Sequence, residues 1–444
     1  MGEETKFKNI IKLAWPAIVS QAAIVMVGLI DLFFIRKIGT VAIAAVSVAN
    51  LVNTTIYNFL DGIKHGTTVL VSRYLGAQKK EAISKVFYIS LISGIILGIA
   101  LMFVAYPLSV GCYQLIGDES IKFDGVEYLY ILTLAAPFVL IFYTFTGFFR
   151  GLEDTLTPLW ITAGIGICNA ILDYAFVYGK FGAPQMGVKG AAIASFLSYA
   201  FGSIACLVVL LKSHLTKQYV KIKSTTEKIF SEYFIISVEI GAYSGFYYLA
   251  QCIFTLFFGK LGPSALAVFQ ITNQVFLLLY LPARGFAIAA TITTGKLIGS
   301  KKNDLVAKAT LNNLAVTTII VVVIAGLIFG LAPYIAQLFS PTDAYVASIS
   351  TTTIRLVCVE QIIALFYFIP TGALTGAEDT RFIMFEDFFA EYLVLLPSAY
   401  LLIFTLDYGI YGGYAAFFLR TIFNTLIILW RFFWDKSWIK SKVD

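Results

Sequence analysis

The sequence VFYISLISGIILGIALMFVAYPLSVG, residues 86–111, decides the fold of this chain. It carries no charged side chain over a length greater than the about 20 apolar residues that a helix needs to cross a bilayer. Lipid offers no hydrogen-bond partners, so a run this long can satisfy its backbone only as a helix; barrel strands would be shorter and would alternate in polarity. The segment therefore predicts a membrane-spanning helix.

Similar apolar runs fill most of the chain. Of its 444 residues, 59% are hydrophobic and 13% charged, whereas soluble domains carry about 25% charge. The longest polar stretch, 212–228, is too short for a soluble catalytic domain. The sequence predicts an all-α polytopic membrane protein with spans near 9–35, 43–72, 85–111, 125–149, 158–180, 187–212, 231–259, 265–295, 307–331, 347–374, 382–405 and 409–434.

Positive charge gathers on one side of this topology. Lys and Arg are concentrated at both termini and in the loops after every second expected helix, which predicts cytoplasmic termini in the plasma membrane. Because the formal charge of +6 is scattered over loops, we expect no nucleic-acid partner. No disulfide or metal spacing of cysteines, phosphate-binding glycine loop or catalytic set is visible, so we expect no enzyme and no cofactor.

The two halves of the chain repeat each other. TGFFRGLEDT at 146–155 matches TGALTGAEDT at 371–380 with a spacing of 225 residues, and Gly76 matches Gly299 with a spacing of 223. We predict two six-helix lobes, 1–214 and 231–444, joined by a cytoplasmic linker at 215–230. With six helices each, the repeats would be related by a pseudo-two-fold axis along the membrane normal.

The first repeated segment resembles a family signature. FRGLEDTLTP at 149–158 and SRYLGAQ at 72–78 are similar to segments of the multidrug and toxic compound extrusion (MATE) transporters, and the acids described below favour the DinF-type branch. The resemblance implies a cation-driven antiporter that exports organic, often cationic, compounds by alternating access between two lobes. We expect a monomer in membrane lipid; a flippase for lipid-linked precursors, of the related superfamily, is the alternative.

Buried acids in the first lobe are the candidate coupling site. Asp31, Asp173 and Ser195 are expected at one depth in the outer half of the membrane, and Asn169 lies one turn from Asp173 on the same helix face. Two close carboxylates cannot both stay ionised cheaply, so a proton or Na⁺ would bind, with Na⁺ at Asp31, Asn169 and Asp173. The resemblance assigns the same residues. The alternative is that neighbouring hydroxyls satisfy both acids, which then serve packing alone.

The second lobe lacks these acids. Phe254 and Ser398 stand at the repeat positions of Asp31 and Asp173, so we expect coupling to be confined to the first lobe. Because a complete second set of acids is absent from the expected positions, we favour H⁺ over Na⁺ as the coupling ion.

Further charges lie inside the expected spans. Asp61, Lys64 and His65 share one helix face, and Arg284 occupies the repeat position of Asp61. We hypothesise an Asp61–Arg284 ion pair that closes the inner side of the cleft; the alternative is a local pair of Asp61 with Lys64 or His65.

Acids of the second half form a separate group of candidates. Glu239 and Glu391 could bind a cationic substrate or pair with Arg355 or Arg420. NorM-type members of the family use acids in helices 7 and 10, but Glu239 falls outside the matching position. Glu360 is the remaining candidate in this half; Glu386 and Asp387 are the other acids inside its expected spans.

Overall fold

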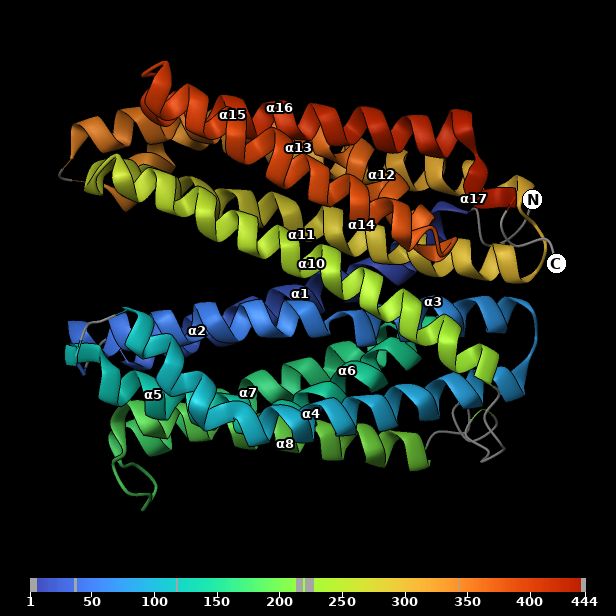
Figure 1. Cartoon of the computed structure of the whole chain (residues 1–444), viewed down its shortest axis with the longest axis horizontal. Helices are drawn as coiled ribbons and strands as arrows, with labels where there is room; N and C mark the ends of the chain where they lie inside the picture. The colour runs from blue at the N-terminus through green and yellow to red at the C-terminus, as the bar shows by residue number, and fades with distance from the viewer. Residues whose placement is uncertain are drawn as a thin grey trace. The chain divides into compact units, whose positions relative to one another are not determined.

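The described part of the protein consists of helices joined by short turns and loops. The computed structural model describes residues 6–35, 38–116, 119–212, 219, 227–341 and 343–440, and these residues contain no β-strand. Each of the twelve expected spans coincides with a helix or with a run of consecutive helical segments (Figure 1). The predicted all-α fold is confirmed.

Contacts between helices divide the chain into two compact units, here named the N-unit (Val19–Gly241) and the C-unit (Met1–Ile18 with Ala242–Asp444). The N-unit is built from most of α1 (Phe7–Ile35), α2 (Thr40–Leu60), α3 (Gly62–Gly76), α4 (Lys80–Ile116), α5 (Glu119–Leu134), α6 (Ala136–Gly151), α7 (Leu156–Tyr178), α8 (Gly187–Lys212) and the beginning of α10 (Glu227–Lys260).

The C-unit contains the remaining helices. It comprises α11 (Pro263–Gly299), α12 (Asp304–Phe339), α13 (Ala344–Gly376), α14 (Thr380–Phe389), the π-helical η2 (Ala390–Leu395), α15 (Leu396–Tyr400), the π-helical η3 (Leu401–Thr405), α16 (Gly409–Leu429), the π-helical η4 (Trp430–Asp435) and α17 (Ser437–Lys440), together with the start of α1 and most of α10.

Two helices are shared between the units. Helix α1 passes from the C-unit to the N-unit after Ile18, and α10 passes from the N-unit to the C-unit after Gly241. These points are separated by the same 223 residues that separate Gly76 from Gly299. The units thus differ from the predicted lobes in where these helix ends belong. Most of the predicted linker lies outside the described residues.

The start of α1, which packs in the C-unit, and the start of α10, which packs in the N-unit, are here called the borrowed helix ends. A glycine of the receiving unit lies against each of them. In the N-unit, a Cβ at Gly62 of α3 would overlap the Ser237 carbonyl oxygen of α10. In the C-unit, a Cβ at Gly285 of α11 would overlap the Ile18 side chain of α1 and would lie 3.2 Å from the Ala14 carbonyl oxygen. Both glycines therefore permit helix axes to approach closely, as small residues do in membrane helix pairs.

The repeated TG pair has the same role in each unit. A Cβ at Gly147 would overlap the Lys64 carbonyl oxygen, and one at Gly372 would overlap that of Ala287. A threonine secures each contact: Thr68 donates to the Gly147 carbonyl at 3.3 Å, and Thr291 donates to the Gly372 carbonyl at 2.8 Å.

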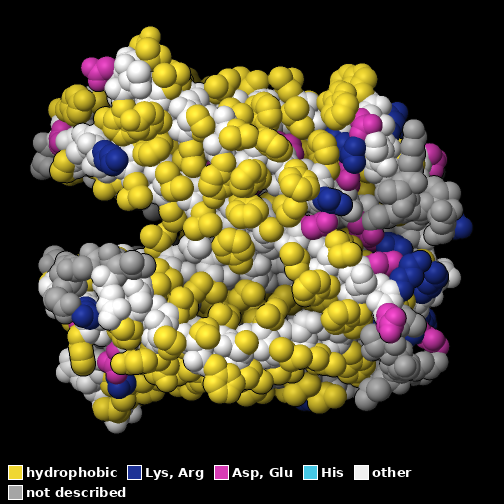
Figure 2. All heavy atoms as spheres, in the orientation of Figure 1, with side chains coloured by type: hydrophobic (Ala, Val, Ile, Leu, Met, Phe, Trp, Pro, Cys, Tyr) yellow, Lys and Arg dark blue, Asp and Glu magenta, His cyan; other side chains and the backbone are white. Residues whose placement is uncertain are grey.

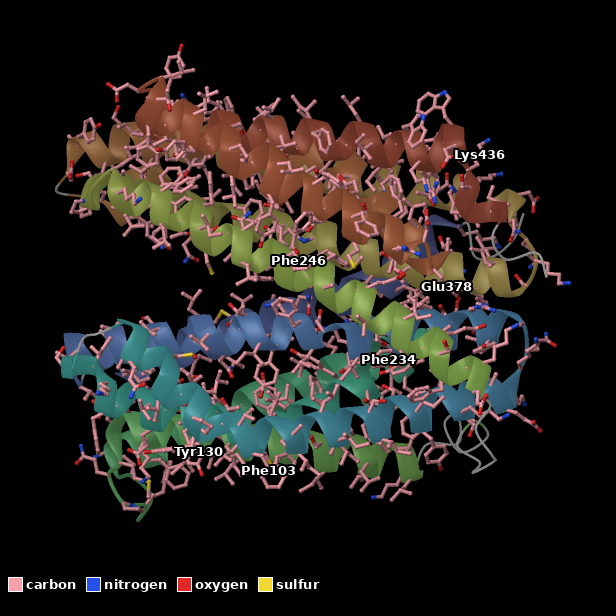
Figure 3. All side chains as sticks on the ribbon, in the orientation of Figure 1. Phe103, Tyr130, Phe234, Phe246, Glu378 and Lys436 are labelled. Carbon is pink, nitrogen blue, oxygen red and sulfur yellow. The ribbon has the colours of Figure 1, made fainter. Side chains whose placement is uncertain are left out.

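The same motif ends each helix with one turn geometry. Glu153 after α6 and Glu378 after α13 adopt left-handed backbones, with φ of 64° and 61°. The next residue's amide then donates back to a carbonyl five residues earlier, Asp154 to Phe149 and Asp379 to Leu374. Glu378 is labelled at this turn in Figure 3. The motif therefore encodes helix packing and a helix end together.

Both units expose many large hydrophobic side chains. Within the described residues, ten helices or continuous helical runs are long and apolar enough to span a membrane, and α5 with α6 forms an eleventh candidate bent by 45°. Tyrosines and Glu239 make α10 less apolar. On the face shown in Figure 2, hydrophobic side chains cover the middle of each unit and charged ones gather near the ends. Phe103 of α4, labelled in Figure 3, is 82% exposed.

Candidate functional site: a buried acid pair in the N-unit

Three helices of the N-unit bring the four predicted coupling residues together. Asp31 lies near the end of α1, Asn169 and Asp173 lie one turn apart on α7, and Ser195 lies on α8. All four side chains are buried; Asn169 and Asp173 are 0% exposed. Because α7 and α8 pack along each other, the amide and the hydroxyl face the same space as the acids.

A short hydrogen-bonded chain links three of these residues. The Asn169 side-chain nitrogen donates to Ser195 Oγ at 3.2 Å, and Ser195 Oγ donates to Asp31 Oδ2 at 3.2 Å. Ser195 thus uses its hydroxyl as acceptor and donor at once, which orients it toward the carboxylate.

The two acids adjoin each other. The carboxyl groups of Asp31 and Asp173 interact directly, although ionised carboxylates can only accept hydrogen bonds. Asp31 Oδ1, Asn169 Oδ1 and both carboxyl oxygens of Asp173 are buried and accept no hydrogen bond from any described residue. Four orphaned acceptor oxygens in one buried space fit a proton between the acids or a small cation among the oxygens.

Tyr128 of α5 completes the site. It is 0% exposed and faces both Asp31 and Asp173, and Tyr199 of α8 also faces Asp31. Sequence reasoning did not find these tyrosines, because nothing in the chain separates them from the other 23 of its 25 tyrosines. The neighbours of the acid pair named here are all uncharged, so they leave its negative charge uncompensated.

The predicted inner cluster forms a local group in the N-unit. Asp61 pairs with Lys64, and His65 Nε2 lies 3.1 Å from Asp61 Oδ2. Lys64 Nζ also lies 4.7 Å from the centre of the Tyr143 ring. This is the local arrangement that the sequence left open. Arg284 belongs to the C-unit, so its pairing with Asp61 stays a prediction.

The candidate acids of the second half lie in different units: Glu239 is in the N-unit, and Glu360 and Glu391 are in the C-unit. Glu239 lies in the part of α10 that belongs to the N-unit and is half-buried. Glu391 receives a hydrogen bond from Arg420 Nη1 at 2.7 Å, which is the predicted alternative of an ion pair. Glu360 accepts from Thr421 Oγ1 at 2.6 Å.

Comparison with known proteins shows to which family this chain belongs. The family model described as MatE matches residues 16–175 and 243–401, one segment in each sequence repeat. The chain belongs to the MatE family. The resemblance to MATE transporters is thereby confirmed, and the protein is a multi-pass membrane transporter rather than an enzyme.

Relatives of this MatE protein match it over nearly its full length. A probable multidrug resistance protein NorM of Thermotoga maritima is 26% identical and aligns over 98% of this chain and 94% of its own. The multidrug resistance protein MdtK of Edwardsiella ictaluri is 25% identical, with 98% of each chain covered. The DinF-type assignment stays a prediction.

Solved structures support the fold of this MatE chain. A multidrug resistance MATE family transporter of the MOP superfamily in an outward-facing conformation has a TM-score of 0.87 and 21% identity, with 99% of this chain and 97% of the other covered. A MATE structure in the straight conformation has a TM-score of 0.86 and 22% identity, with 98% and 96% covered. At these identities the likeness concerns the fold alone.

Proposed function

We propose that this MatE protein is a cation-coupled antiporter that exports organic, often cationic, compounds by alternating access, with H⁺ as the coupling ion. It would work as a monomer in the plasma membrane with both termini on the cytoplasmic side. The relatives named multidrug resistance proteins support export of drug-like compounds.

The acid pair in the N-unit carries this proposal. Asp31 and Asp173 are buried against each other among uncharged partners, with oxygen atoms that no described residue satisfies. Two ionised carboxylates in such a place repel each other and lack solvation, so at least one proton or a cation is needed to hold them. The acid pair must hold a proton or a cation while it is shut off from water, and it can release that ion when water reaches it. Such a pair is suited to couple ion movement to transport.

Coupling follows from competition between charges. A proton taken up at Asp31 and Asp173 removes negative charge from the N-unit and weakens its hold on a positively charged compound. Release of that proton on the cytoplasmic side restores the hold. By reciprocity, the organic cation must lower the affinity for the proton by the same factor. Asn169 and Ser195 position Asp31 for this exchange through their hydrogen bonds.

Transport in proteoliposomes tests the proposal. Ethidium, a flat organic cation, serves as the probe, and either a pH gradient or a Na⁺ gradient is imposed. We expect the pH gradient to drive ethidium transport in the natural protein and Asp31→Asn or Asp173→Asn to abolish the response. Asp407→Asn is the control, because Asp407 is an exposed loop acid at φ 55°, a backbone conformation that Asn tolerates.

Three outcomes decide between the alternatives. A response to the Na⁺ gradient alone would make Na⁺ the coupling ion at the same site. Natural behaviour of both Asn variants would contradict the site, and transport without any response to either gradient would contradict the antiporter. The flippase alternative has less support, because Lys64 and Arg420 pair with acids of their own units and leave less positive charge for an anionic headgroup.

A further inference from the structure

The C-unit encloses a second buried charged centre that differs from the N-unit acid pair. Glu360 of α13, Glu386 and Asp387 of α14, Glu391 of η2 and Arg420 of α16 are between 0% and 7% exposed. Electrostatic contacts connect Arg420 to each of the four acids. The centre therefore contains four carboxyl groups and a single guanidinium group.

Two of the four acids have strong partners. Glu391 binds Arg420 in an ion pair of 2.7 Å. Glu360 accepts hydrogen bonds from Thr421 Oγ1 at 2.6 Å and from the Gln361 side-chain nitrogen at 2.8 Å. Both carboxylates are therefore supported in their ionised form.

The other two acids are poorly supported. Asp387 accepts one hydrogen bond, from the Tyr367 hydroxyl at 3.3 Å, while its other oxygen accepts none from the described residues. Glu386 is 5% exposed, and neither of its carboxyl oxygens receives a hydrogen bond from any described residue. It faces Asp387, Glu391 and Arg420. An orphaned acid thus points into the centre beside like charges.

Groups from α13, α16 and α10 bear on this centre. Glu360 and Tyr367 come from α13, Arg420 comes from α16, and α10 contributes two more tyrosines, of which Tyr243 faces Tyr367 and Tyr247 faces Arg420 and Glu391. Among these groups, Arg420 supplies the only positive charge, so four carboxyl groups share one positively charged partner.

The excess of carboxyl groups over positive charges in this centre indicates which ligand it binds. Burying an isolated carboxylate costs far more than folding can supply, so three uncompensated negative charges cannot persist in one closed space. We infer that Glu386 and Asp387 bind protons and form a second coupling centre in the C-unit, independent of Asp31 and Asp173. Each uptake converts a carboxylate into a carboxylic acid with a proton from water, and release returns that proton when the centre opens.

A proton fits this centre better than a larger cation. The Arg420 guanidinium already binds Glu391, so a metal ion or an organic cation would have to compete with it for that carboxylate. The described residues also contain no group of three His, Cys, Asp or Glu side chains arranged to hold a metal ion. In addition, α14, which carries Glu386 and Asp387, continues directly into the π-helical η2, which carries Glu391, and such segments are frequent at functional sites.

This inference rests on the proposed function and changes its stoichiometry. Sequence reasoning expected coupling to be confined to the first lobe, and the family resemblance placed second-lobe acids in helices 7 and 10. Of the four acids in this centre, Glu360 comes from the tenth span, whereas the two proposed to bind protons, Glu386 and Asp387, lie in the eleventh span, and Arg420 lies in the twelfth. A transporter with proton sites in both units would exchange more protons per cycle than the N-unit pair alone allows.

Infrared difference spectroscopy of the full chain in lipid nanodiscs tests the inference with the proton itself as the probe. Protonated carboxylic acids have a carbonyl stretching band separate from that of carboxylates. Raising the pH from about 6 to about 9 avoids exposed Asp and Glu, which titrate near pH 4. The Asp31→Asn/Asp173→Asn double variant silences the N-unit acid pair, and Asp407→Asn added to it is the control.

In the silenced background we expect the carbonyl band to lose intensity as the pH rises. Adding Glu386→Gln and Asp387→Asn together should abolish this loss, and Asp387→Asn alone should reduce it by roughly half, since two groups share the titration. Thermal unfolding of each variant shows that it is folded. No pH-dependent band in the silenced background, or a band unchanged by the added substitutions, would overturn the inference.

The outcomes separate this inference from the proposed function. If the pH-dependent band persists but a pH gradient drives no ethidium transport in the natural protein, the antiporter is contradicted while the C-unit proton site stands. If transport is driven and no C-unit band exists, the N-unit pair couples alone.

Discussion

The N-unit and the C-unit share a helix framework but not a set of buried charges. Gly62 and Gly285 admit a borrowed helix end in each, and Gly147 and Gly372 admit a second close contact. The N-unit encloses the Asp31–Asp173 pair among uncharged side chains and, separately, the Asp61–Lys64 ion pair, whereas the C-unit encloses one centre of four acids and an arginine. Backbone contacts that set the packing are thus repeated, while side chains that bind charge have diverged.

Aspartates at matching positions of the two repeats bind different partners. Asp154 accepts from the Thr157 amide at 2.9 Å and from its hydroxyl at 2.6 Å at the start of α7. Asp379, at the matching turn, accepts from Arg431 Nε at 2.7 Å and Nη2 at 3.0 Å. The repeated turn fixes where the carboxylate lies, and the following helix decides what it binds.

Removing the buried positive charge of Arg420 should have the largest effect on the stability of the protein. Arg420→Met leaves Glu391 buried without its partner, which typically costs about 3–5 kcal/mol. Thermal unfolding in nanodiscs measures the loss. Arg420→Met combined with Glu391→Met should recover much of it, because both charges are then gone. A single variant as stable as the natural protein would mean that the pair contributes nothing to the fold.

The shared framework is tested by matched glycine substitutions. Gly147→Val and Gly372→Val should each destabilise the protein by about 1–3 kcal/mol, because a side chain there meets the backbone of the neighbouring helix. Gly326→Val is the control, since its Cβ would meet no atom within 4 Å. Clearly unequal losses for the two variants, measured by thermal unfolding, would show that the contacts are not equivalent.

Exchanging residues between the units tests whether their chemistry differs. Asp173→Ser gives the N-unit the residue that the C-unit has at the matching position and should lower pH-driven ethidium transport at least about tenfold, or 1.4 kcal/mol. Ser398→Ala should leave transport within about twofold, because Ser398 Oγ donates to the carbonyls of Val394 and Leu395 in the preceding helical turn. Equal losses would remove the distinction between the two positions.

The two turn aspartates should show the smallest and most subtle difference. Asp154→Ala and Asp379→Ala should each cost about 1 kcal/mol, the first through a lost helix cap and the second through a lost partly exposed ion pair. Salt should weaken only the second effect, because it screens charge pairs but not a hydrogen-bonded cap. Unfolding at low and high salt measures this, and the same salt dependence for both variants would contradict it.

The spans could be predicted from sequence because hydropathy alone defines them. Breaks within the spans were missed: α2 ends at Leu60 and α3 begins at Gly62, and α5 and α6 are bent at Ala135. The second break precedes Pro137, a signal visible in the sequence. The first depends on how closely neighbouring helices approach, which a single chain position does not reveal.

The N-unit site could be predicted because its residues carry positional signals. Asn169 and Asp173 are four residues apart, and Asp31 lies at a matching depth. The C-unit centre was named residue by residue but not assembled, since Glu360, Glu386 and Arg420 meet only if three helices are rotated correctly about their axes. Tyr128 was missed for the same reason.

The exchange of helix ends between the two units bears on how this chain arose. Each unit needs a helix end that the other repeat supplies, through Ala14 and Ile18 in one case and Ser237 in the other. A polypeptide of half this length could complete neither unit alone and would have to trade its first turns with a second copy. Duplication of a half-length chain that paired in this way would place the two crossings at matching positions of the repeats, as is the case after Ile18 and after Gly241.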